Sequence, residues 1–304
     1  MKVVVTDCDF SDLTTERRIL GPDIEVVAAP LPSADQLPEI AADADGLLVQ
    51  YMNIDDDLLA RLPNLRAIVR YGIGLDNIDV AAADRRGIRV RNVPDYCIEE
   101  VAEHALASIL QVSRRLVSFS EAAASGWNPT GVPIPKRLRD QVVGIVGMGR
   151  IGQRLATLAA SLGSTVICHD PYAGHLPRWG PSLPLEEVAT RADHLSLHLP
   201  LNEETSRIVG SDILERLGPE GHLVNTSRGG LVDEEALLKA LDTGALGWAS
   251  LDVLQTEPPT GTSAQVVNHP RVLVTPHVAY LSKASLEALP RRAAETMVRL
   301  LKDG

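Results

Sequence analysis

Cysteine is scarce in this chain of 304 residues and occurs only at Cys8, Cys97 and Cys168. These residues lie far apart and form no C-x-x-C pair, so neither a disulfide framework nor a structural zinc site is expected. Long apolar runs are also missing, since no window of about 18 residues resembles a membrane span. The N-terminus reaches Asp7 too soon to contain the apolar part of a signal peptide. These absences predict a soluble cytoplasmic protein with no membrane partner.

Aromatic residues and positive charge are both in short supply. Phe, Trp and Tyr make up 3% of the chain, so the core must be mainly aliphatic. The net charge of −11 would repel phosphate backbones, so nucleic acid is not an expected partner, although a local basic site for a small anion stays open. The composition is otherwise that of a globular protein, with 45% hydrophobic residues, and the length suits two domains.

Short apolar runs alternate with polar or helical stretches in the first third of the chain. The runs are Val3–Val5, Ile24–Ala29, Gly46–Gln50 and Leu65–Arg70. This alternation predicts the α/β class, with a parallel sheet whose strands are joined by crossover helices.

The pattern changes at Ile98. The stretch Ile98–Ala124 contains no Gly or Pro and is rich in Ala, Leu and Glu, which predicts one long helix. After the Pro-rich break Gly126–Pro135, a second strand–helix series ends in a helix over Ser282–Lys302. The two long helices flanking this series predict a discontinuous first domain of residues 1–97 and 282–304, a second domain of residues 98–281, and a hinge between them. The strands of the second series are expected at 141–146, 165–169, 194–199, 223–225, 248–253 and 272–275.

A glycine-rich motif follows the first strand of the second series. Gly147, Gly149 and Gly152 form G-x-G-x-x-G between an apolar strand and a predicted helix, which is the context of a dinucleotide-binding turn. The first glycine permits the tight turn, the second lets the backbone approach a pyrophosphate, and the third allows close packing of helix and strand. The free N–H groups of the helix N-terminus would bind the phosphates.

Asp170 directly follows the next strand, where a carboxylate is expected to bind the adenosine ribose. The same carboxylate would repel a 2′-phosphate, so the sequence predicts NAD(H) rather than NADP(H). A similar Gly72-Ile73-Gly74 motif has Asn77 where the third glycine belongs, so no second nucleotide site is predicted.

Five motifs in this order resemble the D-isomer-specific 2-hydroxyacid dehydrogenases, which include phosphoglycerate dehydrogenases and the C-terminal-binding-protein corepressors. The resemblance implies two Rossmann-like domains with parallel sheets, a flavodoxin-like substrate domain and an NAD-binding domain. Three segments look closest to the corepressor-like branch, namely Val93-Pro94, Glu99-Glu100 and His277–Ser282. The motifs are Arg70–Asp79, Gly147–Gly152, Asn225–Gly230, Leu251-Asp252-Val253 followed by Glu257-Pro258, and Thr275-Pro276-His277.

The resemblance assigns the catalytic roles to three residues. Arg228 would bind the carboxylate and carbonyl of a 2-keto acid, His277 would be the general acid or base, and Glu257 would hydrogen-bond His277. These roles suit the chemistry of the residues. The planar guanidinium of an arginine can hold a carboxylate through two hydrogen bonds, and a histidine can donate a proton to the oxygen of a ketone as it is reduced.

The resemblance also implies the residues that surround the two ligands. The substrate would meet Tyr51 and the main-chain amides of Ile73 and Gly74, next to Gly72. Asp252 would meet the nicotinamide amide. The other cofactor residues implied are His104, Arg150, Ile151, Pro200, Thr226 and Ser227.

Three other interpretations are weaker. His194 and His198 share one face of a strand but have no third ligand in view, so no metal site is predicted. Cys97 fits a small buried thiol better than a reactive one. The sequence has neither a G-x-S-x-G elbow nor a P-loop motif, which argues against hydrolase and P-loop chemistry.

Two functions of different class remain. One is an NAD-dependent D-2-hydroxyacid dehydrogenase acting on a small 2-keto or 2-hydroxy acid, and the other is an NAD(H)-sensing, corepressor-like binding protein. The absence of an obvious long tail favours the enzyme. The resemblance further implies a homodimer, and the expected arm is Ser113–Asp140, where Trp127 needs a packing site.

Overall fold

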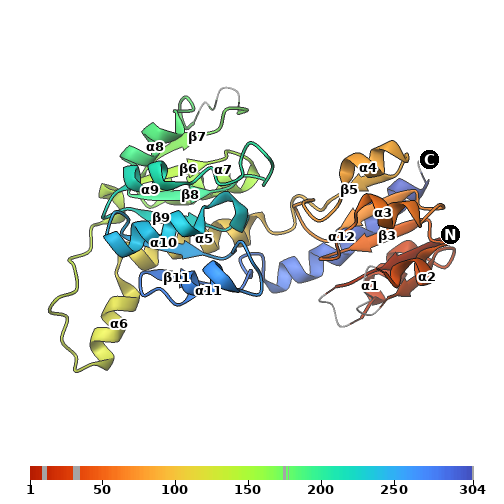
Figure 1. Cartoon of the computed structure of the whole chain (residues 1–304), viewed down its shortest axis with the longest axis horizontal. Coiled ribbons are helices and arrows are strands. Elements are labelled where there is room, and N and C mark those ends of the chain that lie inside the picture. Colours follow the sequence, from red (N-terminus) through yellow and green to blue (C-terminus); the bar gives the residue numbers. More distant parts are fainter. Residues whose placement is uncertain (9–11, 30–34, 174–175, 177, 303–304) are drawn as a thin grey trace. The chain divides into compact units, whose positions relative to one another are not determined.

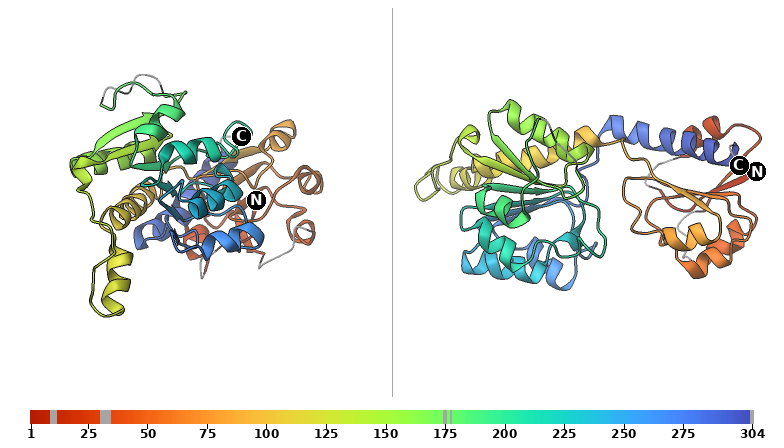
Figure 2. Two further views of the ribbon diagram at one scale, coloured as in Figure 1. Left: turned by 60° about the vertical axis from the view of Figure 1, so that its left-hand side comes forward. Right: turned by 90° about the horizontal axis from the view of Figure 1, so that it is seen from above.

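The computed structural model describes residues 1–8, 12–29, 35–173, 176 and 178–302. The chain divides into two compact units (Figures 1 and 2). The first unit comprises Met1–Tyr96 and Leu281–Gly304, and the second comprises Cys97–Tyr280. Each unit contains one parallel sheet with helices, so the chain has the α/β architecture predicted from the alternation of elements.

The first unit has a five-stranded sheet in the order β2-β1-β3-β4-β5, which is the flavodoxin-like order. The short edge strand β5 was not predicted, because only its middle residue, Val90, is buried. The elements are β1 (Lys2–Val5), α1 (Thr14–Leu20), β2 (Glu25–Ala28), α2 (Leu37–Ala41), β3 (Gly46–Val49), α3 (Asp56–Ala60), β4 (Ala67–Arg70), α4 (Val80–Arg85), β5 (Arg89–Arg91) and α12 (Lys283–Lys302).

The C-terminal helix α12 belongs to the first unit and covers one face of its sheet. Leu289, Ala293 and Met297 are buried in one cluster with strand residues such as Val3. The packing is close, because a Cβ atom at Gly46 of β3 would lie 2.7 Å from the sulfur of Met297. The first unit therefore needs residues from both ends of the chain.

The second unit has a six-stranded parallel sheet in the order β11-β10-β9-β8-β6-β7. The chain passes from β6 to β7 on one side and then to β8 on the other, so the switch point of the sheet lies between β6 and β8. The elements are α5 (Ile98–Ser113), α6 (Leu116–Ala124), η1 (Leu138–Asp140), β6 (Val142–Val146), α7 (Arg150–Ser161), β7 (Thr165–His169), α8 (Leu185–Arg191), β8 (His194–Leu197), α9 (Ser211–Leu217), β9 (His222–Asn225), η2 (Gly229–Leu231), α10 (Glu234–Thr243), β10 (Trp248–Leu251), α11 (Gly261–Val267) and β11 (Val272–Val274).

The expected single helix over Ile98–Ala124 is wrong. The structure has two helices, α5 and α6, because the chain turns at Arg115, whose φ of 55° is left-handed. Helix propensity gave no warning of this turn, since Arg is a good helix former. The side chain of Arg115 lies over the ring of Trp248 at 5.5 Å, a contact between segments distant in the sequence.

The strands of the second unit end at one level. Val146 of β6 pairs with Leu197 of β8, Leu197 pairs with Asn225 of β9, and Asn225 pairs with Leu251 of β10. Residues one or two positions beyond these four therefore form one row along the carboxyl edge of the sheet. That edge is where ligands bind in open parallel sheets.

A chain of buried polar side chains crosses the core near the other end of this sheet. Ser113 Oγ lies 3.0 Å from His194 Nε2, His194 Nδ1 lies 3.0 Å from His222 Nδ1, and His222 Nε2 lies 2.9 Å from Ser250 Oγ. Burial lowers the pKa of His194 to about 3, with smaller effects from the charges of Arg115 and Lys136. Burial also places the pKa of His222 well below its ordinary value.

No helix in the described part of the chain combines the length and the apolar character needed to cross a bilayer.

The two buried histidines should make the second unit sensitive to acid. The unfolded chain protonates them below about pH 6.5, whereas the folded unit does not, so stability is lost as the pH falls through this value. The loss should reach about 1.4 kcal/mol per histidine at pH 5.5. Denaturant titration followed by tryptophan fluorescence measures it, since all three tryptophans belong to this unit. A double His194→Gln, His222→Gln variant should lose the part of this pH dependence that these two rings contribute between pH 7.5 and 5.5. It should keep the part due to His198, whose pKa burial lowers to about 4.

Candidate active site

The glycine-rich turn lies at the switch point of the second sheet. Gly147 has a φ of 95°, and a Cβ atom there would lie 2.3 Å from the carbonyl oxygen of His198, just after β8. Its N–H donates to the carbonyl of His169 at the end of β7. Position 147 therefore accepts only glycine without a shift of the backbone, as the sequence predicts.

The other two glycines of the motif meet opposite surroundings. A Cβ atom at Gly149 would have no neighbour within 4 Å, whereas one at Gly152 would lie 2.0 Å from the carbonyl oxygen of Gly147. Gly152 thus lets α7 pack against the turn, and Gly149 leaves its backbone open at the N-terminus of α7. Arg150 is exposed and Ile151 is partly buried in the first turn of this helix. This open cradle fits the pyrophosphate of a dinucleotide.

Asp170 follows β7 and lies against the same turn. One of its carboxylate oxygens accepts from the N–H of Met148 at 2.7 Å, and the other accepts from Tyr172 and Ala173 at 3.0 and 2.9 Å. Among the described residues, three backbone donors fix the side chain and leave one acceptor position unused, because a carboxylate has about four. This position can accept from a bound ligand.

Two turns at the carboxyl edge of the second sheet carry further residues that are predicted to bind the cofactor. After β9, the buried hydroxyl of Thr226 has no hydrogen-bond partner among the described residues, a condition that a bound polar ligand would relieve. Its neighbour Ser227 donates to the carbonyl of Leu197 at 2.8 Å, which ties the turn to β8. Pro200, beyond β8, is exposed, and its carbonyl accepts from Thr205 at 2.7 Å.

His277 and Glu257 form a hydrogen-bonded pair. His277 Nδ1 lies 2.7 Å from Glu257 Oε2, and each side chain is a little over one-third exposed, at 40% and 37%. Burial opposes the ionisation of Glu257. It is outweighed by hydrogen bonds from His277 and from the N–H of Leu254 and by the charges of His277 and Arg228, so the pKa of the carboxyl lies below its ordinary value. The pair is suited to proton transfer because an ionised Glu257 would stabilise an imidazolium.

Arg228 lies close enough to Glu257 for its charge to act on that carboxyl. Asn225, the last residue of β9, shapes the turn, because its amide donates to the carbonyl of Arg228 at 2.8 Å and its oxygen accepts from the N–H of Ser227 at 3.0 Å. At Gly229 a Cβ atom would lie 2.0 Å from the carbonyl carbon of Leu254. The Arg228 turn therefore packs directly against the loop that carries Glu257.

Asp252, after β10, organises the His277 turn. This residue is 3% exposed, and its carboxylate accepts from the hydroxyl of Thr275 at 2.5 Å and from the N–H groups of Val278 and Ala279 at 2.9 and 2.8 Å. The three bonds fall on both sides of His277, whose φ of 56° is left-handed. Hydrogen bonds to the Asp252 carboxylate thus hold a conformation that a non-glycine residue rarely adopts.

His104 joins this group from α5. Its Nε2 lies 3.0 Å from the hydroxyl of Thr275 and 3.9 Å from the carboxylate of Asp252. The structure therefore brings His104 and Asp252 together, as expected for one predicted site.

The predicted substrate residues of the first unit gather at the carboxyl edge of its own sheet. Tyr51, 55% exposed, follows β3, and its N–H donates to the carboxylate of Asp7 at 2.5 Å. The loop at Gly72 follows β4. Among the described residues, no hydrogen bond uses the N–H of Ile73 or Gly74, so both amides are available to an anion.

The histidines considered for a metal have other partners. His194 belongs to the buried chain in the core, and His198 Nε2 lies 2.9 Å from Ser196 Oγ. Within the part of the chain that the structure describes, no group of three His, Cys, Asp or Glu side chains could hold a metal ion. Cys97 is buried, as predicted.

Sequence reasoning missed three residues that shape this site. Asn225 and Thr275 were noted only as parts of motifs, although each fixes a turn that carries a site residue. Glu234 was not noted, and it lies 3% exposed beside the Glu257 loop. The polar residues at the ends of strands were a usable signal for the first two. Nothing local separates Glu234 from Glu235.

Comparison with known proteins identifies the family of the chain. The sequence model described as "D-isomer specific 2-hydroxyacid dehydrogenase, NAD binding domain" matches residues 106–279, more than half of the chain. The chain is 37% identical over 281 residues to the D-3-phosphoglycerate dehydrogenase of Mycobacterium tuberculosis, covering 91% of this chain and 52% of that protein. It thus spans about half the length of the phosphoglycerate dehydrogenases it matches. It is also 33% identical over 263 residues to the glycerate dehydrogenase of Methylorubrum extorquens, covering 84% and 82% of the two chains.

Solved structures of other proteins share the fold of this chain. The TT0316 protein of Thermus thermophilus superposes with a TM-score of 0.87 at 33% identity, covering 100% of this chain and 97% of that one. An NADPH-dependent glyoxylate/hydroxypyruvate reductase of Sinorhizobium meliloti, solved with NADP and malonate, gives a TM-score of 0.84 at 29% identity, covering 100% and 94%. The second unit is therefore an NAD(P)-binding domain, and the chain belongs to the D-isomer-specific 2-hydroxyacid dehydrogenase family.

Proposed function

We propose that this protein is an NAD(H)-dependent dehydrogenase that interconverts a small 2-keto acid and the D-2-hydroxy acid. The observation that carries the proposal is the His277–Glu257 pair at 2.7 Å beside Arg228, on the same sheet edge as the dinucleotide turn. An acid–base pair, a guanidinium and a dinucleotide cradle together suit reduction of a keto acid. The relatives named as dehydrogenases favour this proposal over an NAD(H)-sensing binding protein.

The residues of the chain would bind, orient and protonate the substrate. Gly147, Gly149 and Asp170 would hold NAD(H), which when bound supplies or accepts the hydride. Arg228 would hold the carboxylate and carbonyl of the keto acid through its planar fork. His277 would donate a proton to the carbonyl oxygen during reduction and accept it during oxidation.

The other residues would support these steps. Glu257 would stabilise the protonated imidazole of His277, and Asp252 would both hold the turn of His277 and accept from the nicotinamide amide. In the first unit, the unused amides of Ile73 and Gly74 would bind the substrate carboxylate, with Gly72 allowing the loop and Tyr51 lining the substrate.

We also propose the reducing cytoplasm as the compartment. The three cysteines lie far apart in the sequence and form no C-x-x-C pair. A chain without a disulfide framework suits a reducing compartment.

Variants at His277 and Arg228 test the catalytic assignment. With NADH and a panel of 2-keto acids, His277→Ala should lower kcat by about 10² to 10⁴-fold, because general acid–base catalysis contributes that much. Arg228→Ala should impair keto-acid binding and turnover while leaving NADH binding, measured by titration, nearly intact. An unchanged kcat for His277→Ala at saturating substrate would refute the assignment.

The Glu257→Gln variant tests the assignment through the pH dependence of the rate of keto-acid reduction. Reduction needs the proton that His277 would supply, so its rate should fall at high pH. Without the carboxylate the protonated form is less stable, and the fall should move to lower pH.

Cofactor preference follows from Asp170. The kcat/KM should be higher with NADH than with NADPH, because the carboxylate accepts from a free ribose hydroxyl and repels a 2′-phosphate. Asp170→Ala should narrow the preference, mainly by weakening the affinity for NAD(H). A wild-type preference for NADPH would contradict this prediction.

We propose that the protein is a homodimer formed through the arm Ser113–Asp140 of the second unit. The arm leaves the body of this unit as α6 and returns through a long connection (Figures 1 and 2). It presents Trp127 and Ile134 at 83% and 91% exposure, together with Leu116 and Val117. Several large apolar side chains exposed on one arm are typical of a protein–protein contact.

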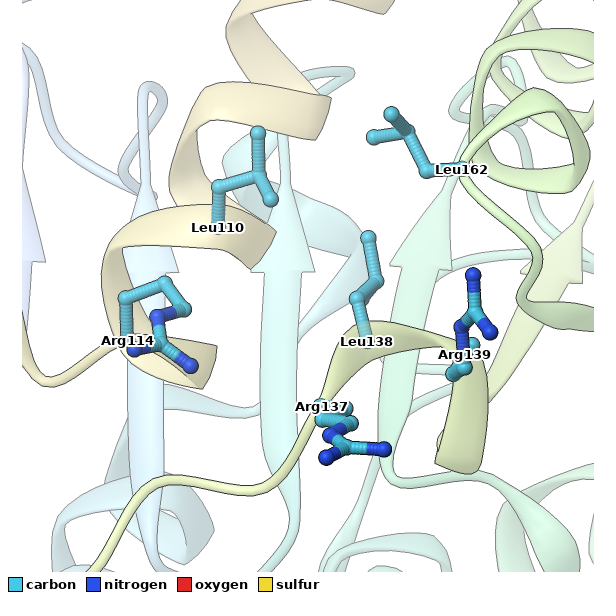
Figure 3. Close-up of a pocket in the computed structure, with 6 residues that line it drawn as sticks. All are labelled: Leu110, Arg114, Arg137, Leu138, Arg139 and Leu162. Carbon is cyan, nitrogen blue, oxygen red and sulfur yellow. The ribbon is translucent and has the colours of Figure 1, made fainter.

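The two ends of the arm meet at a cavity of about 490 Å³ (Figure 3). Arg114 at the start of the arm and Arg137 near its end both line the cavity, together with three leucines. We include this cavity in the proposed dimer surface because it continues the arm. The lining residues are Leu110, Arg114, Arg137, Leu138, Arg139 and Leu162.

Light scattering tests the assembly. At micromolar concentration the wild-type protein should give about twice the chain mass of 32.7 kDa. Ile134→Asp should shift the mass toward one chain, because a buried unpaired charge weakens an interface. Val267→Asp, at a 36% exposed apolar side chain outside the arm, is the matched control and should leave the mass unchanged. A wild-type monomer would eliminate the proposal.

A further inference from the structure

We propose that Glu234, acting with Ser263, is a positioning residue for the loop Leu254–Glu257 and so aims Glu257 at His277. The inference deepens the proposed function and rests on it. It concerns a buried carboxylate that lies outside the predicted site.

Side chains hold three successive N–H groups of this loop. The N–H of Leu254 donates to Glu257 Oε1 at 2.8 Å, that of Gln255 donates to Glu234 Oε1 at 2.8 Å, and that of Thr256 donates to Ser263 Oγ at 3.2 Å. Ser263 in turn donates to Glu234 Oε2 at 2.6 Å. Glu234 therefore controls two of the three attachments, one directly and one through Ser263.

The remaining attachment, from the N–H of Leu254 to Glu257, explains why the position of the loop matters for Glu257. One oxygen of Glu257 accepts from Leu254 within the loop, and the other lies 2.7 Å from His277 Nδ1. If the loop shifts, the carboxylate cannot keep both bonds. The same loop packs against the Arg228 turn at Gly229, so its position also affects the guanidinium.

The helix itself does not need Glu234. Asp233 is the N-cap of α10, and its carboxylate accepts from the N–H groups of Glu235 and Ala236. Glu234 is 3% exposed, and burying a carboxylate is costly unless its oxygens are satisfied. Both of its oxygens bond to Gln255 and Ser263 rather than to the first turn of the helix, which indicates a role in placing the loop.

The test compares pH profiles of keto-acid reduction in the full chain. Glu234→Ala should lower kcat/KM by up to about 10²-fold, the scale of a misplaced catalytic group. The fall in rate at high pH should also move to lower pH, in the direction expected for Glu257→Gln. In the double variant Glu234→Ala, Glu257→Gln the pH shift should be no larger than in Glu257→Gln alone, because both changes act on one carboxylate.

Three further variants separate positioning from folding. Glu234→Gln keeps one acceptor for Gln255 and should recover part of the activity. Ser263→Ala, a smaller change that guards against a misfolded Glu234→Ala, should move the pH profile the same way by less. Asp233→Ala is the matched control, since it should lower the midpoint of denaturation and leave the pH profile unchanged.

The outcomes distinguish this inference from the proposed function. A wild-type chain that turns over no 2-keto acid would overturn the proposed function, and this inference with it. A wild-type chain that is active, with Glu234→Ala and Ser263→Ala variants that fold and keep its pH profile, would overturn this inference alone. An equal pH shift in Asp233→Ala would also overturn it, because loss of helix stability would then suffice.

Discussion

The backbone hydrogen bonds that keep β6, β8, β9 and β10 in register set the level at which each of these strands ends. In a parallel sheet a slip by one residue would turn every side chain to the opposite face and displace the turn that follows. Gly147, Thr226 and Asp252 each come directly after a strand of this row. Arg228, Glu257 and His277 are then placed by turns that begin at the same edge.

Buried or partly buried carboxylates fix those turns. Asp170 holds the glycine-rich turn and Asp252 holds the turn of His277, each by accepting from backbone N–H groups. Glu234 holds the loop of Glu257 by accepting from the N–H of Gln255 and the hydroxyl of Ser263. Several such bonds offset the cost of removing a carboxylate from water. The site is thus shaped by acceptors that lie behind the residues proposed to react.

Local patterns explain what the sequence could predict. The roles of Gly147 and Gly152 depend on a strand, a turn and a helix that adjoin in the chain, so the motif alone predicted their close approaches. The pairing of His277 with Glu257 came from the resemblance to a family and not from the spacing of the two residues.

Contacts between distant segments explain what the sequence could not predict. The turn at Arg115 lies against Trp248, more than 100 residues away, and no propensity encodes it. Glu234 and Glu235 are adjacent and chemically identical, yet only the fold decides which of them is buried against Gln255. The edge strand β5 pairs only with β4 and has a single apolar residue among its three, so it carries no apolar run that the sequence could reveal.

The buried chain from Ser113 to Ser250 has a direction. A neutral imidazole carries one hydrogen, so when His194 holds its hydrogen at Nδ1 it donates to His222, which must then carry its own at Nε2 and donate to Ser250. In the opposite arrangement every hydrogen in the row points the other way. The tautomers of the two rings are therefore correlated, and the hydroxyl orientation at Ser113 on α5 is linked to that at Ser250 on β10, although the two residues never touch.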